Sequence, residues 1–161
     1  QALYSWNVSR VPTEELLTFS WLKKDSEFTP NELEEQTFAS FIISGTIDHL
    51  DEIDNLISSH LSSSWTMERI NKVSLAILRT STYEIKFQAG SNPKIVIDEA
   101  VNIAKEYGSD DSYKFINAIL DKIEKDLLEV KNSTKDTQSI LHNIKSAGAA
   151  KRQENHIRLR E

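Results

Sequence analysis

Two helices that meet at one tight corner are encoded by residues 94–123, which read KIVIDEAVNIAKEYGSDDSYKFINAILDKI. Apolar residues recur at helical spacing on both sides of Gly108, so each predicted helix has one apolar face. The glycine stands where a left-handed residue would end the first helix, and Ser109, Asp110 and Asp111 are candidate N-caps for the second. The apolar faces consist of Ile97, Ala100, Val101, Ala104 and Tyr107, and of Phe115, Ile116, Ile119, Leu120, Ile123 and Leu127.

The start of the second helix is a candidate contact for nucleic acid. Free backbone N–H groups, the Ser112 hydroxyl, the Lys114 cation and the Phe115 ring would gather there, and such a set can hold a phosphate and stack a base. Phe115 has an equal alternative as a core residue, because it lies at helical spacing from Ile119. The two aspartates that precede the helix have the alternative role of caps.

Composition limits the classes of protein to consider. At 161 residues, with 39% hydrophobic and 27% charged residues and only 4 Gly and 3 Pro, the chain is predicted to be one globular, helical domain. It has no cysteine, which excludes disulfides, thiol catalysis and thiolate metal sites. No histidine pair, calcium-binding loop or glycine-rich phosphate loop stands out, so neither a metal site nor a catalytic site is expected.

Charge and hydropathy make further predictions. No apolar run approaches the roughly 20 residues of a membrane span and no signal peptide is visible, so a soluble protein is expected, compatible with a cytoplasmic location. The net charge of −6 argues against a general nucleic-acid coat protein, so any RNA binding must be local. Basic residues do gather near the end of the chain, namely Lys145, Lys151, Arg152, Arg158 and Arg160.

The first half of the chain is also predicted to be helical. Residues 1–6 are typical of the tail of a helix, and a short helix is expected from Thr13 through Trp21. A long amphipathic helix is expected from Asn31 to about His60, with Gly45 as a candidate kink.

A central helix is predicted from about Glu68 to Phe87, because apolar residues nearly encircle it. Arg79 within it needs a partner, for which Glu84 and Glu99 are candidates. The second corner helix is expected to end near Val130, followed by a polar stretch, a weak helix around residues 140–144 and a linker-like segment at 146–150.

Three blocks of the chain carry a family pattern. Residues 1–6, QALYSW, form the first block, the segment from Trp65 to Ile85 forms the second, and the corner residues 97–123 form the third. The third block resembles the carboxy-terminal signature of the NusB family of transcription antitermination factors. The first block is similar to the end of that family's first helix, and the second to its central helix.

The resemblance implies an all-α domain of about seven helices in two small bundles. It implies no catalysis and no cofactor. Such a protein, together with the ribosomal protein NusE, would bind the single-stranded boxA element of nascent ribosomal RNA and join the antitermination complex on RNA polymerase.

The resemblance also assigns roles to residues. Six positions match the family's RNA-facing surface, and they are Gln1, Tyr4, Asp111, Ser112, Lys114 and Phe115. On the side where the family binds NusE, this chain has Ser74 in place of an acidic residue and Thr80 in place of an apolar one. The family's first helix is arginine-rich, yet here the chain begins at its end and the basic residues lie at the other terminus.

Two interpretations of that basic end remain open. If the chain is read as a circle, residues 152–161 lead directly into Gln1. The protein would then be a circular permutant, in which the basic residues of this end bind RNA; these are Lys151, Arg152, Arg158 and Arg160. Alternatively, residues 151–161 are a solvated basic tail. The expected organisation is a NusB-like domain at residues 1–145, a linker at 146–150 and the basic segment at 151–161.

Two other functions and the oligomeric state also remain open. The chain would be the NusB-like module of a ribosomal RNA cytosine methyltransferase if an α/β domain accompanied it. It would be a helical interaction scaffold, binding protein but not RNA, if the basic end proved disordered. The sequence does not choose between a monomer and a homodimer.

Overall fold

The computed structural model describes residues 1–22 and 28–158, with side-chain detail up to residue 145 apart from 143. All regular structure in this described part is helical, which confirms the predicted all-α fold of about seven helices. The chain divides into two compact units, Gln1–Glu124 and Lys125–Glu161. The helices are α1 (Ala2–Ser9), α2 (Thr13–Leu16), α3 (Pro30–Asp48), α4 (Leu50–Ser59), a 3-10 turn (Met67–Arg69), α5 (Lys72–Phe87), α6 (Pro93–Tyr107) and α7 (Ser112–Arg158).

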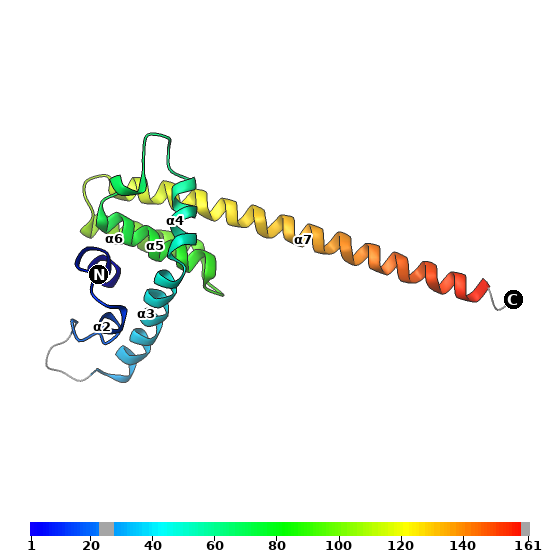
Figure 1. Ribbon diagram of the computed structural model, residues 1–161, viewed down its shortest axis with the longest axis horizontal. Coiled ribbons are helices and arrows are strands. Elements are labelled where there is room, and N and C mark those ends of the chain that lie inside the picture. The colour runs from blue at the N-terminus through cyan, green and yellow to red at the C-terminus, as the bar shows by residue number, and fades with distance from the viewer. Residues whose placement is uncertain (23–27, 159–161) are drawn as a thin grey trace. The chain divides into compact units, whose positions relative to one another are not determined.

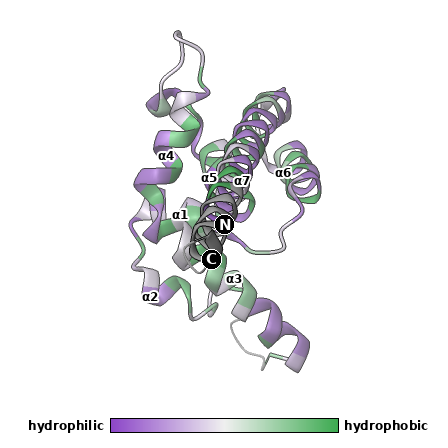
Figure 2. Ribbon diagram, turned by 90° about the vertical axis from the view of Figure 1, so that its right-hand side faces the viewer, coloured by the Kyte–Doolittle hydropathy of each residue, from purple (hydrophilic) through white to green (hydrophobic). Residues whose placement is uncertain are grey.

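Helix α5 is the centre of the first unit. It packs against α1, α3, α4 and α6 (Figure 1). Its buried residues face several directions, as the apolar sequence of this segment predicts. They are Ser74, Leu75, Ile77, Leu78, Ser81, Thr82 and Ile85. In the view coloured by hydropathy, the helices of this unit carry both apolar and polar residues, so they bury one side and solvate another (Figure 2).

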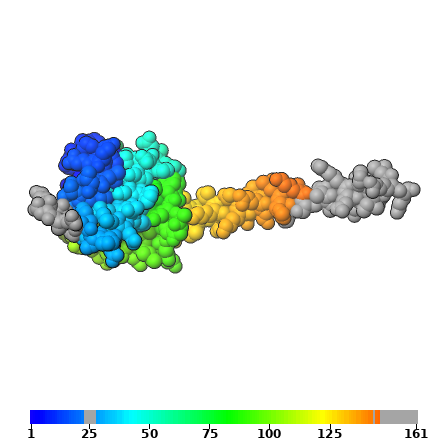
Figure 3. Space-filling view, turned by 90° about the horizontal axis from the view of Figure 1, so that it is seen from below, coloured from blue at the N-terminus to red at the C-terminus, as the bar shows by residue number. Residues whose placement is uncertain are grey.

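The N-terminal helices have an apolar cluster of their own. Ala2 of α1, Leu16 of α2, Phe19 just after α2 and Ile43 of α3 are buried together. In the space-filling view, the segments that form α1, α2 and α3 lie closely against one another (Figure 3). Helix α2 ends at Leu16, earlier than predicted. The carbonyl oxygen of Leu16 accepts a hydrogen bond from Nε1 of Trp21 at 3.0 Å.

The predicted long helix is divided at His49, and the prediction of a kink at Gly45 was wrong. His49 has φ −106° and ψ 20°, and its Nδ1 lies 2.9 Å from the carbonyl oxygen of Gly45. Its ring packs against Phe87, with 4.2 Å between ring centroids. Gly45 serves another purpose: a Cβ there would lie 2.1 Å from atoms of the Tyr83 ring, so only glycine lets that ring approach the backbone.

The start and the ion pair of α5 also differ from the prediction. The helix begins at Lys72, because Asn71 caps it by accepting hydrogen bonds from the N–H groups of Val73 and Ser74 at 2.9 and 3.0 Å. Arg79 does have a carboxylate partner, but it is Asp54 of α4, at 2.8 and 2.7 Å, and neither of the two expected glutamates.

Helix α7 is much longer than predicted. It continues from Ser112 to Arg158, so residues 146–150, expected to form a linker, are helical. No proline interrupts these residues, and Lys, Glu, Leu and Ala, which favour helices, are frequent among them. The predicted domain boundary near residue 145 also differs from the division into units, which falls after Glu124.

Candidate nucleic-acid interface

The corner between α6 and α7 is built differently from its predicted form. Gly108 has φ −83° and ψ 173°, which is extended and not left-handed, and Asp111 has φ 62° instead. A glycine is needed at 108 because of close approach. A Cβ there would lie 2.2 Å from Oγ of Ser112 and 2.4 Å from the carbonyl oxygen of Ala104. The prediction of a left-handed glycine was therefore wrong, although the corner lies where the sequence placed it.

The backbone of this corner bonds to itself. The N–H of Gly108 donates to Ala104 at 2.9 Å, that of Ser112 to Ser109 at 3.0 Å and that of Lys114 to Asp111 at 3.1 Å. Two N–H groups at the start of α7 that were expected to be free are therefore already used. Anion binding here must depend on side chains more than on the helix N-terminus.

An aromatic pair covers one side of the corner. The ring of Phe115 stacks on Trp65, with centroids 5.4 Å apart and planes inclined by 28°. Phe115 is half-buried by this contact, whereas Trp65 remains 44% exposed. The guanidinium of Arg69 lies 5.6 Å from the centre of the Trp65 ring, and its Nη1 donates to the carbonyl of Ser64 at 2.9 Å. Phe115 thus has a packing role, and the neighbouring indole supplies an exposed aromatic surface.

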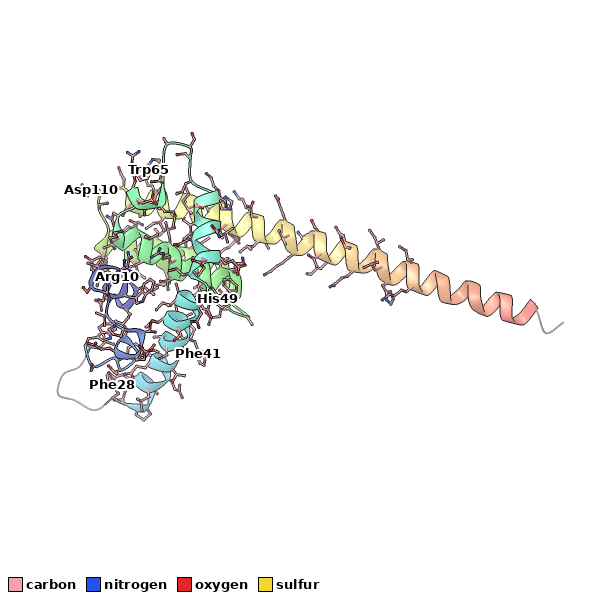
Figure 4. The ribbon with its side chains drawn as sticks, in the orientation of Figure 1. Arg10, Phe28, Phe41, His49, Trp65 and Asp110 are labelled. Carbon is pink, nitrogen blue, oxygen red and sulfur yellow. The ribbon has the colours of Figure 1, made fainter. Side chains whose placement is uncertain are left out.

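A groove of about 270 Å³ lies between these segments. Figure 4 shows Trp65 and Asp110, far apart in sequence, approaching each other at this place. Asn71 joins the two walls, because its Nδ2 donates to Oγ of Ser109 at 3.4 Å while its Oδ1 caps α5. The groove is lined by Trp65, Arg69, Ile70, Asn71, Ser74, Ser109, Asp110, Asp111, Ser112 and Phe115.

Opposite charges meet at the rim of this corner. Nζ of Lys114 lies 2.7 Å from Oδ1 of Asp111, and both side chains are well exposed. The hydrogen bond and charge of Asp111 raise the pKa of Lys114, so this amine stays cationic. Two cations lie over the Tyr113 ring, Nζ of Lys105 at 5.3 Å and Nζ of Lys114 at 5.7 Å from its centroid. The site therefore combines cations with aromatic faces, but a carboxylate competes for one of the cations.

Ser112 corrects the expectation of an exposed hydroxyl. Its Oγ is buried against Gly108 and has no hydrogen-bond partner in the described part of the chain. The residue as a whole is only 8% exposed. Ser112 therefore packs the corner, and its hydroxyl does not face an RNA strand in this conformation.

The structure brings together some of the predicted residues and leaves others apart. Asp111, Lys114 and Phe115 share the corner with Ser112, whereas Gln1 and Tyr4 are exposed at the start of the chain and do not line the groove. The backbone at Lys151, Arg152 and Arg158 is part of α7, but these side chains, like the whole of Arg160, lie outside the described residues.

The two residues expected on the side that faces a protein partner differ in their exposure. Ser74 is buried at 4% exposure beneath the groove. Thr80 is half-buried, and its hydroxyl donates to the carbonyl of Ala76 at 2.7 Å. Both lie on the central helix, which neighbouring helices cover, so Ser74 offers almost no surface to a partner.

Sequence reasoning missed three functional candidates in this site, Trp65, Arg69 and Asn71. The signal that could have found the first two is an aromatic residue in a polar loop with an arginine four positions later. Asn71 was recognisable as an N-cap, but its contact with Ser109 joins residues 38 positions apart and needs the fold.

The described residues contain neither a candidate metal site nor a candidate membrane span. No group of three or more histidine or carboxylate side chains there is arranged to hold a metal ion. In the same part of the chain, no helix combines the length and apolar character required to cross a membrane.

Comparisons with known proteins point to one family. The NusB family matches residues 1–125. The transcription antitermination protein NusB of Treponema denticola is 45% identical over 124 residues, which are 77% of this chain and 88% of that protein. Among solved structures, T. maritima NusB superimposes with a TM-score of 0.65 at 35% identity, covering 77% of this chain and 83% of that one.

A second solved structure carries information about partners. It contains the antitermination factors NusB and NusE in complex with double-stranded RNA, and matches with a TM-score of 0.65 at 26% identity over 77% of this chain and 88% of that one. The family match ends at residue 125, so most of α7 lies beyond it. On the length of that match and the identity to its relatives, this chain belongs to the NusB family of transcription antitermination proteins.

Proposed function

We propose that this protein is a non-catalytic antitermination factor that binds the single-stranded boxA element of nascent ribosomal RNA together with NusE. It would then join the antitermination complex on RNA polymerase, which places it in the cytoplasm. The similarity to relatives named for antitermination, and to a NusB that was solved with NusE and RNA, supports this role. The observation that carries it is the groove lined by Arg69 and by the aromatic pair Trp65–Phe115, with Lys114 paired to the lining residue Asp111.

In this proposal an unpaired base stacks on the exposed Trp65 ring. Phe115 holds the indole from one side, and stacking of a base on an aromatic side chain contributes about 1–3 kcal/mol. Arg69 and Lys114 neutralise the phosphates on either side of that base. Affinity should therefore fall as salt is added, because each neutralised phosphate releases counterions.

The role of NusE follows from charge. The chain as a whole is acidic, with a net charge of −6, so its long-range field repels RNA. Few cations surround the groove, and Asp111 occupies one of them. A basic partner protein would both suit the acidic body and add the phosphate contacts that the groove lacks. We therefore expect weak RNA binding by this protein alone and tight binding with NusE.

The proposal is tested by fluorescence anisotropy with labelled boxA RNA, in the presence of NusE. Trp65→Ala should weaken binding about tenfold, and Arg69→Ala and Lys114→Ala each several-fold. Lys122→Ala is the matched control, because it removes an exposed lysine of α7 that lies eight residues, or about 12 Å, beyond Lys114 along the helix, and it should leave affinity unchanged.

Two results would contradict the proposed site or function. If the groove variants bind like the wild type but a chain ending at Ile144 does not bind, the RNA site lies in the basic end and not in the groove. If no version binds RNA while NusE still binds, the protein is an interaction scaffold.

A further inference from the structure

The second unit carries an apolar stripe along α7. The name α7 stripe is used for six residues of this helix, which are Leu127, Val130, Thr134, Thr137, Leu141 and Ile144. Val130, Leu141 and Ile144 are 63%, 52% and 63% exposed, which is unusual for three large aliphatic residues on one helix. These positions lie beyond the part of the chain that matches the NusB family, so the family fold does not account for them.

The spacing of the stripe is that of a coiled-coil seam. Its members follow one another at alternating steps of three and four residues, which is the heptad pattern of positions that face a partner helix. No charged residue occupies any of these positions between residues 127 and 144. The stripe extends over about 25 Å at a rise of about 1.5 Å per residue.

The two threonines do not interrupt the apolar character of the seam. Oγ1 of Thr134 donates to the carbonyl of Val130, and Oγ1 of Thr137 donates to the carbonyl of Ser133, both at 2.9 Å. Each hydroxyl is thereby satisfied within its own helix. A partner helix would meet the threonine methyl groups without burying an unpaired polar atom.

The charges beside the stripe indicate which partner fits it. The positions that flank the seam directly are Lys131, Gln138 and Lys145 on one side, which is basic, and Asp126, Ser133 and Ile140 on the other, where Asp126 is the charged residue. When two identical helices pair in parallel, the basic flank of each helix faces the acidic flank of its partner. An antiparallel pair would place like charges opposite each other. The flanks therefore suit a second copy of this chain in parallel orientation.

We propose that the α7 stripe joins two copies of this protein into a parallel coiled-coil dimer. This inference goes beyond RNA binding and does not depend on it, since it rests on residues 126–145 alone. A dimer would carry two RNA sites, which would strengthen binding to any RNA with two recognition elements.

Sedimentation equilibrium of the full-length protein over a range of concentrations tests the dimer. Leu141→Glu places two carboxylates in the seam and should weaken dimerisation about 100-fold or more, since both copies lose a buried leucine. Leu128→Glu is the matched control: Leu128 is also exposed, at 48%, but lies outside the stripe, so this variant should dimerise like the wild type. Circular dichroism checks that both variants keep their helix content. A wild type that remains monomeric at every concentration, or two variants with equal effects, would overturn the proposal.

Orientation is tested with a disulfide. The chain has no cysteine, so Val130→Cys introduces the single thiol of each copy. In a parallel dimer the two residues at position 130 face each other across the seam, and mild oxidation should give a covalent dimer in high yield. In an antiparallel pair centred on the stripe they lie far apart. A dimer that resists this cross-link would refute the parallel arrangement.

Discussion

At the scale of single residues, the most informative contact of the site is between Lys114 and Asp111. The exposed ion pair keeps the amine cationic, yet it places a carboxylate where a phosphate would bind. Such exposed pairs contribute little to stability, so their effect is felt mainly in the local field. In the proposed RNA complex Asp111 would therefore lower the affinity, in addition to shaping the corner through its positive φ.

Removing the charge of Asp111 should strengthen RNA binding. Asp111→Asn releases Lys114 and removes a carboxylate that repels phosphate, while asparagine tolerates the left-handed conformation. We expect roughly two- to tenfold tighter binding of boxA RNA in low salt, with a smaller gain in high salt. Asp98→Asn, which removes an exposed carboxylate from α6 away from the groove, is the control in the same anisotropy assay. Weaker binding by the Asp111 variant would show that this carboxylate contacts the RNA itself.

Glu84 gives the protein a defined pH dependence. Burial raises the pKa of Glu84 above its ordinary value of 4.5. The folded state therefore binds a proton that the unfolded state has already lost, so stability falls as pH rises from the unfolded pKa through the folded pKa.

Glu84→Gln should remove this effect. The variant should be more stable than the wild type at neutral pH, where the half-buried carboxylate is ionised, and close to it below the ordinary pKa, where both side chains are neutral. Urea denaturation at the two pH values measures the difference, and Glu124→Gln provides a control on α7 for the loss of one carboxylate. An equal difference at both pH values would contradict the assignment.

At the scale of elements, the α6–α7 corner depends on one glycine. Because Gly108 is extended, its importance comes from the close approach of Ser112 and of the Ala104 carbonyl. A methyl group there cannot be accommodated by moving a flexible side chain alone, since one of the contacts is backbone.

Gly108→Ala should lower the free energy of unfolding by about 1–3 kcal/mol, as overpacking does elsewhere. The double variant Gly108→Ala/Ser112→Ala removes the hydroxyl contact but keeps the carbonyl contact, so it should recover only part of this loss. Thermal unfolding of both variants and of Ser112→Ala measures these differences. Full recovery in the double variant would show that the carbonyl contact is not limiting.

The sequence predicted elements better than their ends or their contacts. Apolar periodicity located the central helix and both corner helices, because a buried face repeats at helical spacing whatever it packs against. The division at His49 was not predictable, because it depends on rings that lie on α5. For the same reason Asp54 was missed as the partner of Arg79: local sequence shows that a buried cation needs a carboxylate, but not which helix provides it.

The candidate site was predictable only in part. The corner residues were identified because the RNA-binding chemistry and the family pattern both fall on 111–115, yet the burial of Ser112 follows from how α6 and α7 meet. Trp65 and Arg69 reach the corner from a loop and a 3-10 turn about 40 positions earlier in the chain. Contacts of this kind are set by tertiary packing and leave little trace in local sequence.

At the scale of the whole molecule, the chain joins a family domain to a helical segment beyond the family match. Residues 1–125 match the NusB family, and α7 continues to Arg158. The circular-permutant and basic-tail interpretations of residues 151–161 make different predictions for RNA binding.

A chain ending at Ile144 separates these two interpretations. It keeps the groove and the α7 stripe but lacks the cations from Lys145 onward, so it should bind boxA RNA through the groove alone. If the basic end is a solvated tail, affinity and its salt dependence should change little. If the basic end is a displaced RNA-binding helix, affinity should fall by tenfold or more and the salt dependence should become weaker by about one phosphate contact for each cation lost. Anisotropy at two salt concentrations distinguishes the two.

The most direct test of the account is the affinity of the full-length protein for boxA RNA, measured with and without NusE against a scrambled RNA of the same length. We expect weak binding by the protein alone, a clear gain with NusE, and a preference for boxA that Trp65→Ala abolishes. Equal affinity for boxA and scrambled RNA in the presence of NusE would contradict the central claim that this protein recognises boxA through the groove at the α6–α7 corner.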